Sequence, residues 1–331
     1  MVKNKIIVFN TNYINKQQKY NIFLFEYYKK KMKYIIIFTL LAINYLFLDC
    51  YKIKNLKIAI CTMAREENLY IKQFVDYYLK LGIDHIFIYD DNEPNTEKIS
   101  DVLHNPYKSH VTIYDNIINK TLKGQPQAYT LCYNNNKNTF DWIFMCDIDE
   151  YLIIKNNTLK NYLSNESFQK CDFVKIHWVV PTDNNILHYD NRPLLERLKG
   201  PYLNDTHVKT FVKGNIEDLK YDIHSPFSSP FRNISCNNNG EKYNTTKVFF
   251  NDVFDINYDK AYIIHFKYKS TEEYIKKYKR GYRWENSDFL KMRIREYFSD
   301  NKITLEKIQY VENELKLDLS KYKKRLFKNL Q

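Results

Sequence analysis

Three carboxylates follow an apolar run in the stretch DWIFMCDIDEYL, residues 141–152. The run is typical of a buried strand, yet Asp147, Asp149 and Glu150 stand within four positions at its end. A carboxylate is costly to bury unless it is paired, hydrogen-bonded or bound to a cation. These residues therefore lie on an open sheet edge, or a positive charge lies beside them.

Side chains two positions apart in a strand point to the same side, so Asp147 and Asp149 could address one cation. Hard carboxylate oxygens suit Mg²⁺ or Mn²⁺, and such an ion can neutralise the charge on a departing diphosphate. The alternatives are a solvated strand end, or a carboxylate pair that binds a nearby lysine. Glu150 could hold a loop amide, and we do not count it as a metal ligand.

The elements around these acids alternate between strands and helices. We predict strands at 57–64, 84–92, 109–116 and 141–150, and helices at 68–82 and 124–137. Gly82 is a suitable C-cap for the first helix, and Pro126 fits the first turn of the second. This alternation predicts a largely parallel sheet with helices on both faces. Ligands bind such sheets outside the carboxyl ends of the strands, so the acids at 90–91 and 147–149 are expected to share one crevice.

The second half of the chain is less regular. We predict further strands at 171–181, 207–215 and 260–268. A helix at 270–281 begins with Ser270 as N-cap and Glu273 three residues later, which together form a capping box. The chain after Leu290 is predicted to be helical and basic.

The N-terminal segment, 1–55, combines a basic cluster at 29–33 with an apolar run at 34–48. The run is shorter than the roughly 20 residues that a spanning helix needs, and it is typical of a signal peptide or a short signal anchor. The positive residues before it favour a cytoplasmic N-terminus, with the rest of the chain across the membrane. Met32 could be the true start in place of Met1. The alternative, a buried amphipathic helix, would leave the protein cytoplasmic.

Composition limits the classes of function. Hydrophobic residues make up 44% and aromatic residues 16% of the 331 residues, which excludes a mainly disordered chain. The formal net charge is +12, but residues 58–301 contain 32 Lys and Arg against 33 Asp and Glu. The folded part is therefore not a basic surface, and we predict no nucleic-acid partner.

The six cysteines form no C-x-x-C pair, which argues against a structural zinc site. Cys61 and Cys146 fall inside predicted strands and are interpreted as small buried residues. A bridge between Cys171 and Cys236 could form in an oxidising compartment, a question that the sequence leaves open. Six N-glycosylation sequons begin at Asn119, Asn156, Asn165, Asn204, Asn233 and Asn244. In a chain this rich in Asn they support a secretory location only slightly.

Taken in order, these motifs resemble the GT-A glycosyltransferases. The chain is similar to the group related to glycosyltransferase family 92 and its family 2-like relatives in the stretches TMAREENLYIKQFVDYYLKLGIDHIFIYDDNE, GQPQAYTLC and DWIFMCDIDEYL. The resemblance continues through HVKTFVKG and IIHFKYKSTEEYIKKYKRG and covers roughly residues 57–285.

The resemblance implies a Rossmann-like GT-A domain at 56–290, with a mostly parallel central sheet flanked by helices and a less regular acceptor-side half. The basic segment 1–55 would precede this domain, and a helical basic tail, 291–331, would follow it. The implied reaction moves a sugar from a nucleotide-sugar, expected to be a UDP-sugar, to a glycan or glycoconjugate hydroxyl. Inversion and a Mn²⁺ (or Mg²⁺) cofactor are also implied.

The same resemblance assigns roles around the expected crevice. Donor contacts would come from the first loop, the second strand end, the 124–137 helix and a later basic group: Thr62, Arg65, Glu67, Asp90, Asp91, Gln127, Asp147, Lys269, Lys277 and Arg280. The metal ligands would be Asp147, Asp149 and His265, and His224 would lie on the acceptor side. The alternatives are a salt bridge between Arg65 and Glu67, a core role for His265, and plain surface roles for Gln127 and the basic residues.

Inverting transfer needs a base that deprotonates the acceptor hydroxyl, and we expect a carboxylate in this role. Asp183, Glu196 and Asp222 are candidates, and we predict Asp183 from its place in the loop after WVVP.

The sequence therefore predicts a metal-dependent glycosyltransferase that is membrane-tethered or lumenal in the secretory pathway. One alternative is a non-catalytic carbohydrate- or nucleotide-binding protein that keeps the GT-A fold, although the presence of Asp147, Asp149 and His265 favours an enzyme. The other is a metal-dependent nucleotidyl- or phosphotransferase. That class would normally need a glycine-rich phosphate loop, and the sequence contains no G-x-G-x-x-G or Walker pattern.

Overall fold

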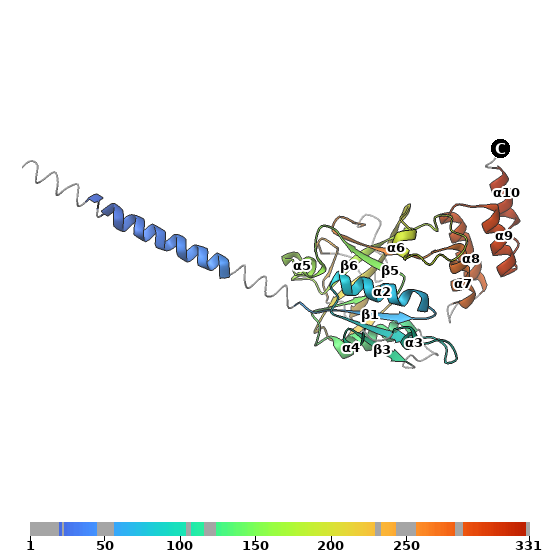
Figure 1. The fold of residues 1–331 in the computed structure, drawn as a ribbon, viewed down its shortest axis with the longest axis horizontal. Helices are drawn as coiled ribbons and strands as arrows, with labels where there is room; N and C mark the ends of the chain where they lie inside the picture. Colours follow the sequence, from blue (N-terminus) through green and yellow to red (C-terminus); the bar gives the residue numbers. More distant parts are fainter. Residues whose placement is uncertain are drawn as a thin grey trace, which may run out of the picture. The chain divides into compact units, whose positions relative to one another are not determined.

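A computed structural model describes residues 20–21, 23–44, 56–103, 107–115, 124–228, 233–242, 256–281 and 287–328. The chain divides into two compact units, Met1–Asn55 and Leu56–Gln331. Residues 23–44 of the first unit form one helix, drawn in blue in Figure 1, with exposed side chains along its length. Of the helices that the structure describes, none is both long enough and apolar enough to span a bilayer. The predicted apolar run at 34–48 lies on this helix as far as residue 44, and its last four residues fall outside the described part.

The second unit is built on a mixed sheet. Its strands are β1 (Ile58–Ala64), β2 (His85–Asp90), β3 (Val111–Asp115), β4 (Trp142–Met145), β5 (Glu150–Ile154), β6 (Phe173–Pro181), β7 (Tyr202–Lys213), β10 (Ser235–Cys236) and β11 (Ala261–His265). The order across the sheet is β3-β2-β1-β4-β7-β6-β11-β5, with β10 beside β6. A separate small hairpin consists of β8 (Leu219–Tyr221) and β9 (Pro226–Ser228).

Parallel pairing predominates in the first half of the sheet. β1 pairs in parallel with both β2 and β4, and β2 pairs in parallel with β3. β7 then inserts antiparallel between β4 and β6, while β11 runs parallel to β6 and antiparallel to β5. The predicted α/β class with a mainly parallel sheet is therefore confirmed in its coarse form, and the sheet as a whole is mixed.

Helices lie on both faces of this sheet. The helical elements before the C-terminal group are α2 (Asn68–Leu81), α3 (Ile99–Val102), α4 (Gly124–Asn136), α5 (Leu159–Leu163), α6 (Leu194–Arg197) and the 3₁₀ turns η1 (Tyr107–Ser109) and η2 (Glu166–Phe168). Alternate residues of β1 face opposite clusters, with Ile58 and Ile60 packed on the α2 side and Ala59 and Cys61 on the α4 side. Figure 1 shows α2 and α4 on either side of β1.

The end signals of α2 and α7 act as predicted. Gly82 adopts a left-handed φ of 107° after α2, a conformation that suits glycine. Ser270 and Glu273 form the capping box of α7 (Thr271–Arg280). Local chemistry therefore sets the end of α2 and the start of α7.

The predicted continuous strand at 141–150 is wrong. β4 ends at Met145 and β5 begins at Glu150, and a short turn lies between them. The backbone N–H of Glu150 donates to the carbonyl of Asp147 at 3.1 Å, and the carboxylate of Glu150 accepts from the N–H of Asp147 at 2.9 Å. These local bonds replace ladder bonds, so Asp147 and Asp149 lie on a turn and not on a strand.

Three helices follow α7 at the C-terminal end: α8 (Ser287–Asp300), α9 (Leu305–Leu315) and α10 (Ser320–Lys328). They enclose a third apolar cluster that includes Tyr274 of α7, Tyr297 of α8 and Val311 of α9. Residues 291–328, the described part of the segment predicted as a helical basic tail, are largely helical and contribute side chains to this cluster.

Two disulfides cross-link the second unit. Cys61 of β1 is bonded to Cys132 of α4, and Cys171 before β6 is bonded to Cys236 of β10. The interpretation of Cys61 as a plain buried residue is therefore wrong, because sequence spacing gave no indication of a partner 71 residues away. Cys146 is buried with a free thiol, as expected.

Removal of the second disulfide should destabilise the fold. The Cys171–Cys236 bond closes a loop of 65 residues, and bonds of this kind stabilise folded proteins by about 2–4 kcal/mol. We expect the double variant Cys171→Ser/Cys236→Ser to lose this amount in guanidinium unfolding. In the unreduced, denatured wild type, alkylation should label Cys146 and spare the four bonded cysteines, whereas labelling of Cys171 and Cys236 would contradict the bond.

Candidate active site

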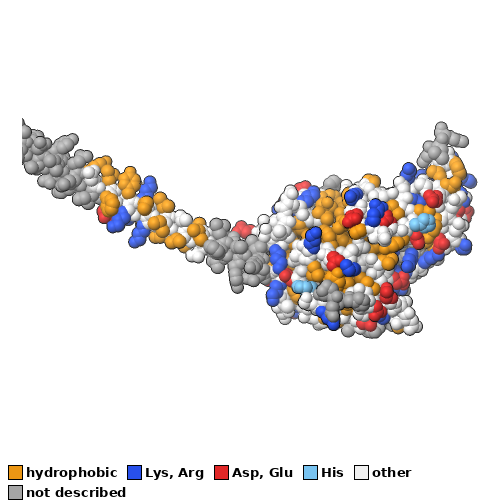
Figure 2. Space-filling view, in the orientation of Figure 1, with side chains coloured by type: hydrophobic (Ala, Val, Ile, Leu, Met, Phe, Trp, Pro, Cys, Tyr) orange, Lys and Arg blue, Asp and Glu red, His pale blue; other side chains and the backbone are white. Residues whose placement is uncertain are grey.

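The carboxyl ends of β2 and β4 flank the carboxyl end of β1. Ala64 pairs with Asp90, and Cys61 pairs with Met145, so both acidic segments emerge at the same edge of the sheet. On the face of the second unit seen in Figure 2, acidic and basic side chains are interspersed, in agreement with the balanced charge of residues 58–301. The described residues therefore form no continuous basic surface on that face.

Asp90 and Asp91 are both nearly buried, at 3% and 4% exposure. The carboxylate of Asp90 accepts from the backbone N–H of Asn92 at 2.9 Å and from that of Ile99 at 2.8 Å. Asn92 in turn accepts from the N–H of Glu66 at 2.6 Å. Asp90 therefore fixes the loop between β2 and α3, and this loop supports the loop after β1.

Asp147 has a buried cation as its partner. The ammonium of Lys209, on β7, lies 3.1 Å from the Asp147 carboxylate and 3.7 Å from that of Glu150. The side chains of Lys209 and Glu150 are fully buried, while that of Asp147 is 28% exposed. Burial raises the pKa of Glu150 well above its usual range, whereas for Lys209 the two carboxylates outweigh burial and raise the pKa.

Two residues of α4 complete the surroundings of Asp147. Tyr129 donates its hydroxyl to the Asp147 carboxylate at 3.0 Å, and the Gln125 side-chain amide donates to the same oxygen. Gln127, predicted as a donor contact, lies half-buried in the first turns of the same helix. Sequence reasoning missed Gln125 and Tyr129, although their spacing of four residues places them on one helix face.

Asp149 faces a different set of groups. The ammonium of Lys277, on α7, lies 2.7 Å from one carboxylate oxygen, and Nε2 of His265, on β11, lies 3.7 Å from the other. Burial alone would raise the pKa of Asp149, but Lys277, with His265 and Lys269, holds it well below its usual range. Burial lowers the pKa of His265 to about 3, so its ring is neutral. Within the described part, Nδ1 of His265 is buried without a hydrogen-bond partner.

The other predicted basic residues meet at the loop after β1. Lys269 binds the Glu67 carboxylate at 2.9 Å and lies over the ring of Tyr70 at 3.8 Å. Arg280 lies 3.6 Å from Glu67 and donates to the backbone carbonyl of Arg65. Arg65 itself lies 4.0 Å from Glu93, so the alternative of a salt bridge between Arg65 and Glu67 is not the arrangement found. Thr62 is fully buried on β1.

The predicted metal ligands do not form one cluster. Asp149 and His265 lie side by side, while Asp147 is bound to Lys209. Within the described residues, no group of three or more His, Cys, Asp and Glu side chains is arranged to hold a metal ion. Asp149 and His265 are thus neighbours, and the first Asp of D-x-D pairs with a lysine, an alternative that the sequence had left open.

His224, predicted on the acceptor side, lies beside Trp178 of β6. The two ring centroids are 5.2 Å apart, and the ring of His265 is 4.2 Å from that of Trp178. The rings of His224 and His265 therefore both contact Trp178, and the acceptor-side role of His224 stays a prediction.

The candidates for the base have different surroundings. Asp183 is 1% exposed and binds the Lys307 ammonium at 2.7 Å, and its carboxylate also accepts from the hydroxyl of Tyr297. A carboxylate held in this way within the C-terminal helices has no free approach for a hydroxyl, which argues against the predicted role. Glu196 is exposed on α6, and Asp222, after β8, accepts from the N–H of Ile223.

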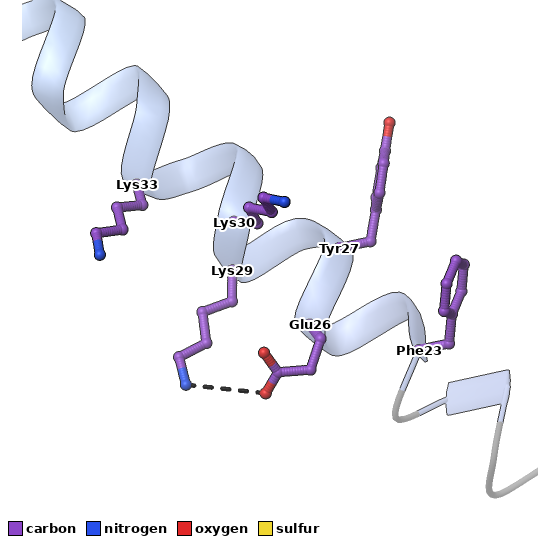
Figure 3. A pocket seen from close by; sticks show the side chains of 6 residues that line it. All are labelled: Phe23, Glu26, Tyr27, Lys29, Lys30 and Lys33. Atoms are coloured by element: carbon purple, nitrogen blue, oxygen red, sulfur yellow. Dashed lines mark ion pairs between the residues drawn. The ribbon is translucent and has the colours of Figure 1, made fainter.

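A concavity in the first unit is not lined by residues from several elements. Figure 3 shows that its lining side chains all project from one helix: Phe23, Glu26, Tyr27, Lys29, Lys30 and Lys33. Its ion pair, between Lys29 and Glu26 at 3.9 Å, is exposed. These groups do not converge from several elements, so the concavity is the space between neighbouring side chains of a helix.

Comparison with known proteins identifies relatives of this chain. The family model described as glycosyltransferase family 92 matches residues 54–317. A glycosyltransferase family 92 protein of Oryza sativa subsp. japonica is 30% identical over 111 residues, which cover 33% of this chain and 18% of that protein. A second, of Ricinus communis, is 24% identical over 112 residues, which cover 34% of this chain and 20% of that protein. The matched stretch thus spans about a fifth of the length of these relatives.

Among solved structures, HddC from Yersinia pseudotuberculosis is similar with a TM-score of 0.35 and 15% sequence identity. The match covers 67% of this chain and 97% of that chain.

Substitution of Lys209 should destabilise the second unit. The change Lys209→Met removes the cation from a buried carboxyl group and a half-buried carboxylate, and the loss of one partner from such a pair costs about 3 kcal/mol. Denaturant unfolding should show this loss, and the double variant Lys209→Met/Glu150→Gln should recover part of it. The control is Lys220→Met on the exposed face of β8, for which we expect a change within about 0.5 kcal/mol. Equal stability of the two single variants would contradict the pairing.

Proposed function

Because the chain belongs to glycosyltransferase family 92, we propose that it transfers a sugar from a nucleotide-sugar donor, a UDP-sugar, to a hydroxyl of a glycan or glycoconjugate. The observation that carries this proposal is the position of Asp149 at the sheet edge, between Lys277 and His265. One acid, one neutral imidazole and a neighbouring group of cations are the groups that a diphosphate with its metal ion requires. We further propose that the α/β fold is of the GT-A type, which the acids after the parallel strands support.

The donor diphosphate is proposed to bind Lys269, Lys277 and Arg280. Their side chains are 6%, 21% and 11% exposed, and all three bind acids at this edge. Cations held by few solvent contacts attract phosphate oxygens more strongly than solvated ones. The nucleoside would lie towards the loop after β1, near Arg65 and Glu67.

A divalent cation, Mn²⁺ or Mg²⁺, is proposed to bind Asp149 and His265. Their facing oxygen and nitrogen atoms are 3.7 Å apart, which suits two ligands at about 2 Å from one ion. The neutral form of His265 is the form that binds metals, and the donor diphosphate would supply further oxygens. When bound, the cation neutralises the negative charge that develops on the leaving diphosphate.

Asp147 is not assigned as a direct metal ligand in this proposal. Lys209 lies 3.1 Å from its carboxylate and would repel a divalent ion placed there. Its exposed part is better placed to accept a hydrogen bond from the donor, and we assign it to the ribose.

We also propose that the protein is lumenal or membrane-tethered in the secretory pathway. The two disulfides support this location, since such bonds persist in oxidising compartments. The basic cluster and apolar run of the N-terminal segment are typical of the signal that leads there.

The donor assignment is tested by turnover of sugar nucleotides. UDP-, GDP- and CMP-sugars are incubated with the protein, with and without Mn²⁺, and nucleotide release is measured. We expect release from a UDP-sugar that depends on Mn²⁺ and falls at least about 100-fold in Asp149→Asn, because the ligand and the charge are lost together. The control Asp190→Asn removes a partly exposed acid bound to Arg192 and should leave the rate unchanged.

Three outcomes would contradict parts of this proposal. If the wild type binds UDP but turns over no donor, the protein is a binding module. If no nucleotide binds, the glycosyltransferase activity itself is wrong. If Asp149→Asn is as active as the wild type, the metal assignment is wrong.

The location is tested by glycosylation in a eukaryotic host. Asn156, Asn165 and Asn204 begin sequons on exposed residues, so we expect endoglycosidase treatment to lower the apparent mass of the full chain. The triple variant Asn156→Gln/Asn165→Gln/Asn204→Gln should lose part or all of this shift. A wild-type chain without any shift, and with reactive thiols at the four bonded cysteines, would contradict a lumenal location.

A further inference from the structure

A cluster of aromatic and imidazole rings lies where β6, β7 and β11 adjoin. Trp178 stands at its centre, with the ring of His207 stacked at 5.1 Å and 15° on it and the ring of His265 at 4.2 Å. His224 lies 4.9 Å from His207 and 5.2 Å from Trp178. The cluster therefore connects His265, beside Asp149, to His207 through a single intervening ring.

His207 differs from the other two histidines in its partner. Asp205, two residues earlier on β7, accepts from Nδ1 of His207 at 2.5 Å and from the backbone N–H of the same residue at 2.8 Å. These hydrogen bonds outweigh burial and lower the pKa of the Asp205 carboxyl to about 2, so the group is ionised. An ionised carboxylate only accepts, so Nδ1 must carry the proton in the neutral ring.

This tautomer leaves the lone pair on Nε2. A histidine with its Nδ1–H bound to a carboxylate is oriented to accept a proton at Nε2, and the carboxylate stabilises the imidazolium that results. The side chain of His207 is 32% exposed, so a molecule in solution can reach it. The other two rings lack this arrangement: Nδ1 of His224 lies 3.3 Å from the carbonyl of Val208, and His265 is 8% exposed and faces Asp149 through Nε2.

We propose that His207, oriented by Asp205, is the base that takes the proton of the acceptor hydroxyl, with Trp178 and His224 as walls of the acceptor subsite. This assignment rests on the proposed sugar transfer and replaces Asp183 as the base. Asp205 acts through His207 and is a positioning residue.

The proposed step forms one bond at the anomeric carbon and breaks another. The acceptor oxygen forms a bond to the anomeric carbon, and the bond from that carbon to the phosphate oxygen breaks. Its electron pair leaves with the nucleoside diphosphate, whose charge Lys277 and Arg280 offset. The hydroxyl proton moves to Nε2 of His207 and leaves for solvent through the exposed side of the ring.

Rescue by imidazole tests this role with a readout that a structural residue would not move. The reaction is hydrolysis of the UDP-sugar that the wild type uses, with water as the acceptor. We expect His207→Ala to lower turnover about 100-fold or more, to bind UDP with Mn²⁺ as tightly as the wild type, and to regain activity when imidazole is added. Asp205→Asn should lower the rate and keep UDP affinity, because the amide can hold the other tautomer.

His188→Ala is the matched control. His188 is also paired with a carboxylate, Glu272 at 3.1 Å, but its side chain is 66% exposed on the surface. This variant should keep the rate of the wild type and show no response to imidazole. If thermal unfolding shows that His207→Ala does not fold, His207→Gln replaces it in the comparisons of turnover and UDP binding. Rescue by imidazole is then not measured, and a fall in the rate of Asp205→Asn supports the role of His207 in its place.

The outcomes separate this inference from the proposed function. A wild type that turns over no sugar nucleotide contradicts the proposed function and, with it, this assignment. An active wild type with an equally active His207→Ala overturns the base alone. A variant that loses turnover together with UDP binding, or that imidazole does not restore, assigns the ring a structural role and also overturns the proposal.

Discussion

The second unit depends on the pairing of acids at one sheet edge with cations from distant parts of the chain. Asp147 and Glu150 would be costly to desolvate alone, and Lys209, about sixty residues later, lies between them. Asp149 is matched by Lys277 and Glu67 by Lys269, each more than a hundred residues away. The lysines that balance the acids of the first half of the chain therefore come from the second half, and its fold brings them to the sheet edge.

Strand register explains how the pairing is achieved. β7 runs antiparallel to β4, and Met145 pairs with Thr210. Lys209 therefore lies one residue beyond the end of β4, where Asp147 follows in the turn. The α7 capping box fixes the start of the helix that carries Lys277 and Arg280. A shift of one residue in β7 would turn Lys209 to the other face of the sheet, since side chains alternate along a strand.

Local sequence patterns predicted the helices and strands. They could not predict which segments, remote from one another in the sequence, pair in the fold. The periodicity of 68–82, the glycine at its end and the capping box at 270–273 each depend on nearby residues, and the structure confirms them. The antiparallel insertion of β7, the partner of Cys61 and the lysine beside Asp147 depend on contacts between remote segments. A lysine among the apolar residues of HVKTFVKG was a usable signal, because a buried lysine needs an anionic partner. Asp205 and His207 are also close in sequence, but the role that we propose for them depends on the rings of β6 and β11 around them.

Because Asp147 pairs with Lys209, the two acids of D-x-D have different cations beside them. A lysine that is fully buried cannot swing into solvent when a second cation arrives, and two positive charges a few ångströms apart in a region of low dielectric repel strongly. Asp149 has a different partner, because Lys277 extends from the end of a surface helix and is 21% exposed. In the proposed transfer, its ammonium would move to a phosphate oxygen of the donor and leave the carboxylate to the metal ion. A neutral imidazole is the form that binds metals, so the neutral state of His265 also favours Asp149 over Asp147 for the proposed metal ion. The protein thus has one acid beside a fully buried cation and one beside a partly exposed cation, and the second is the acid to which we assign the proposed metal ion.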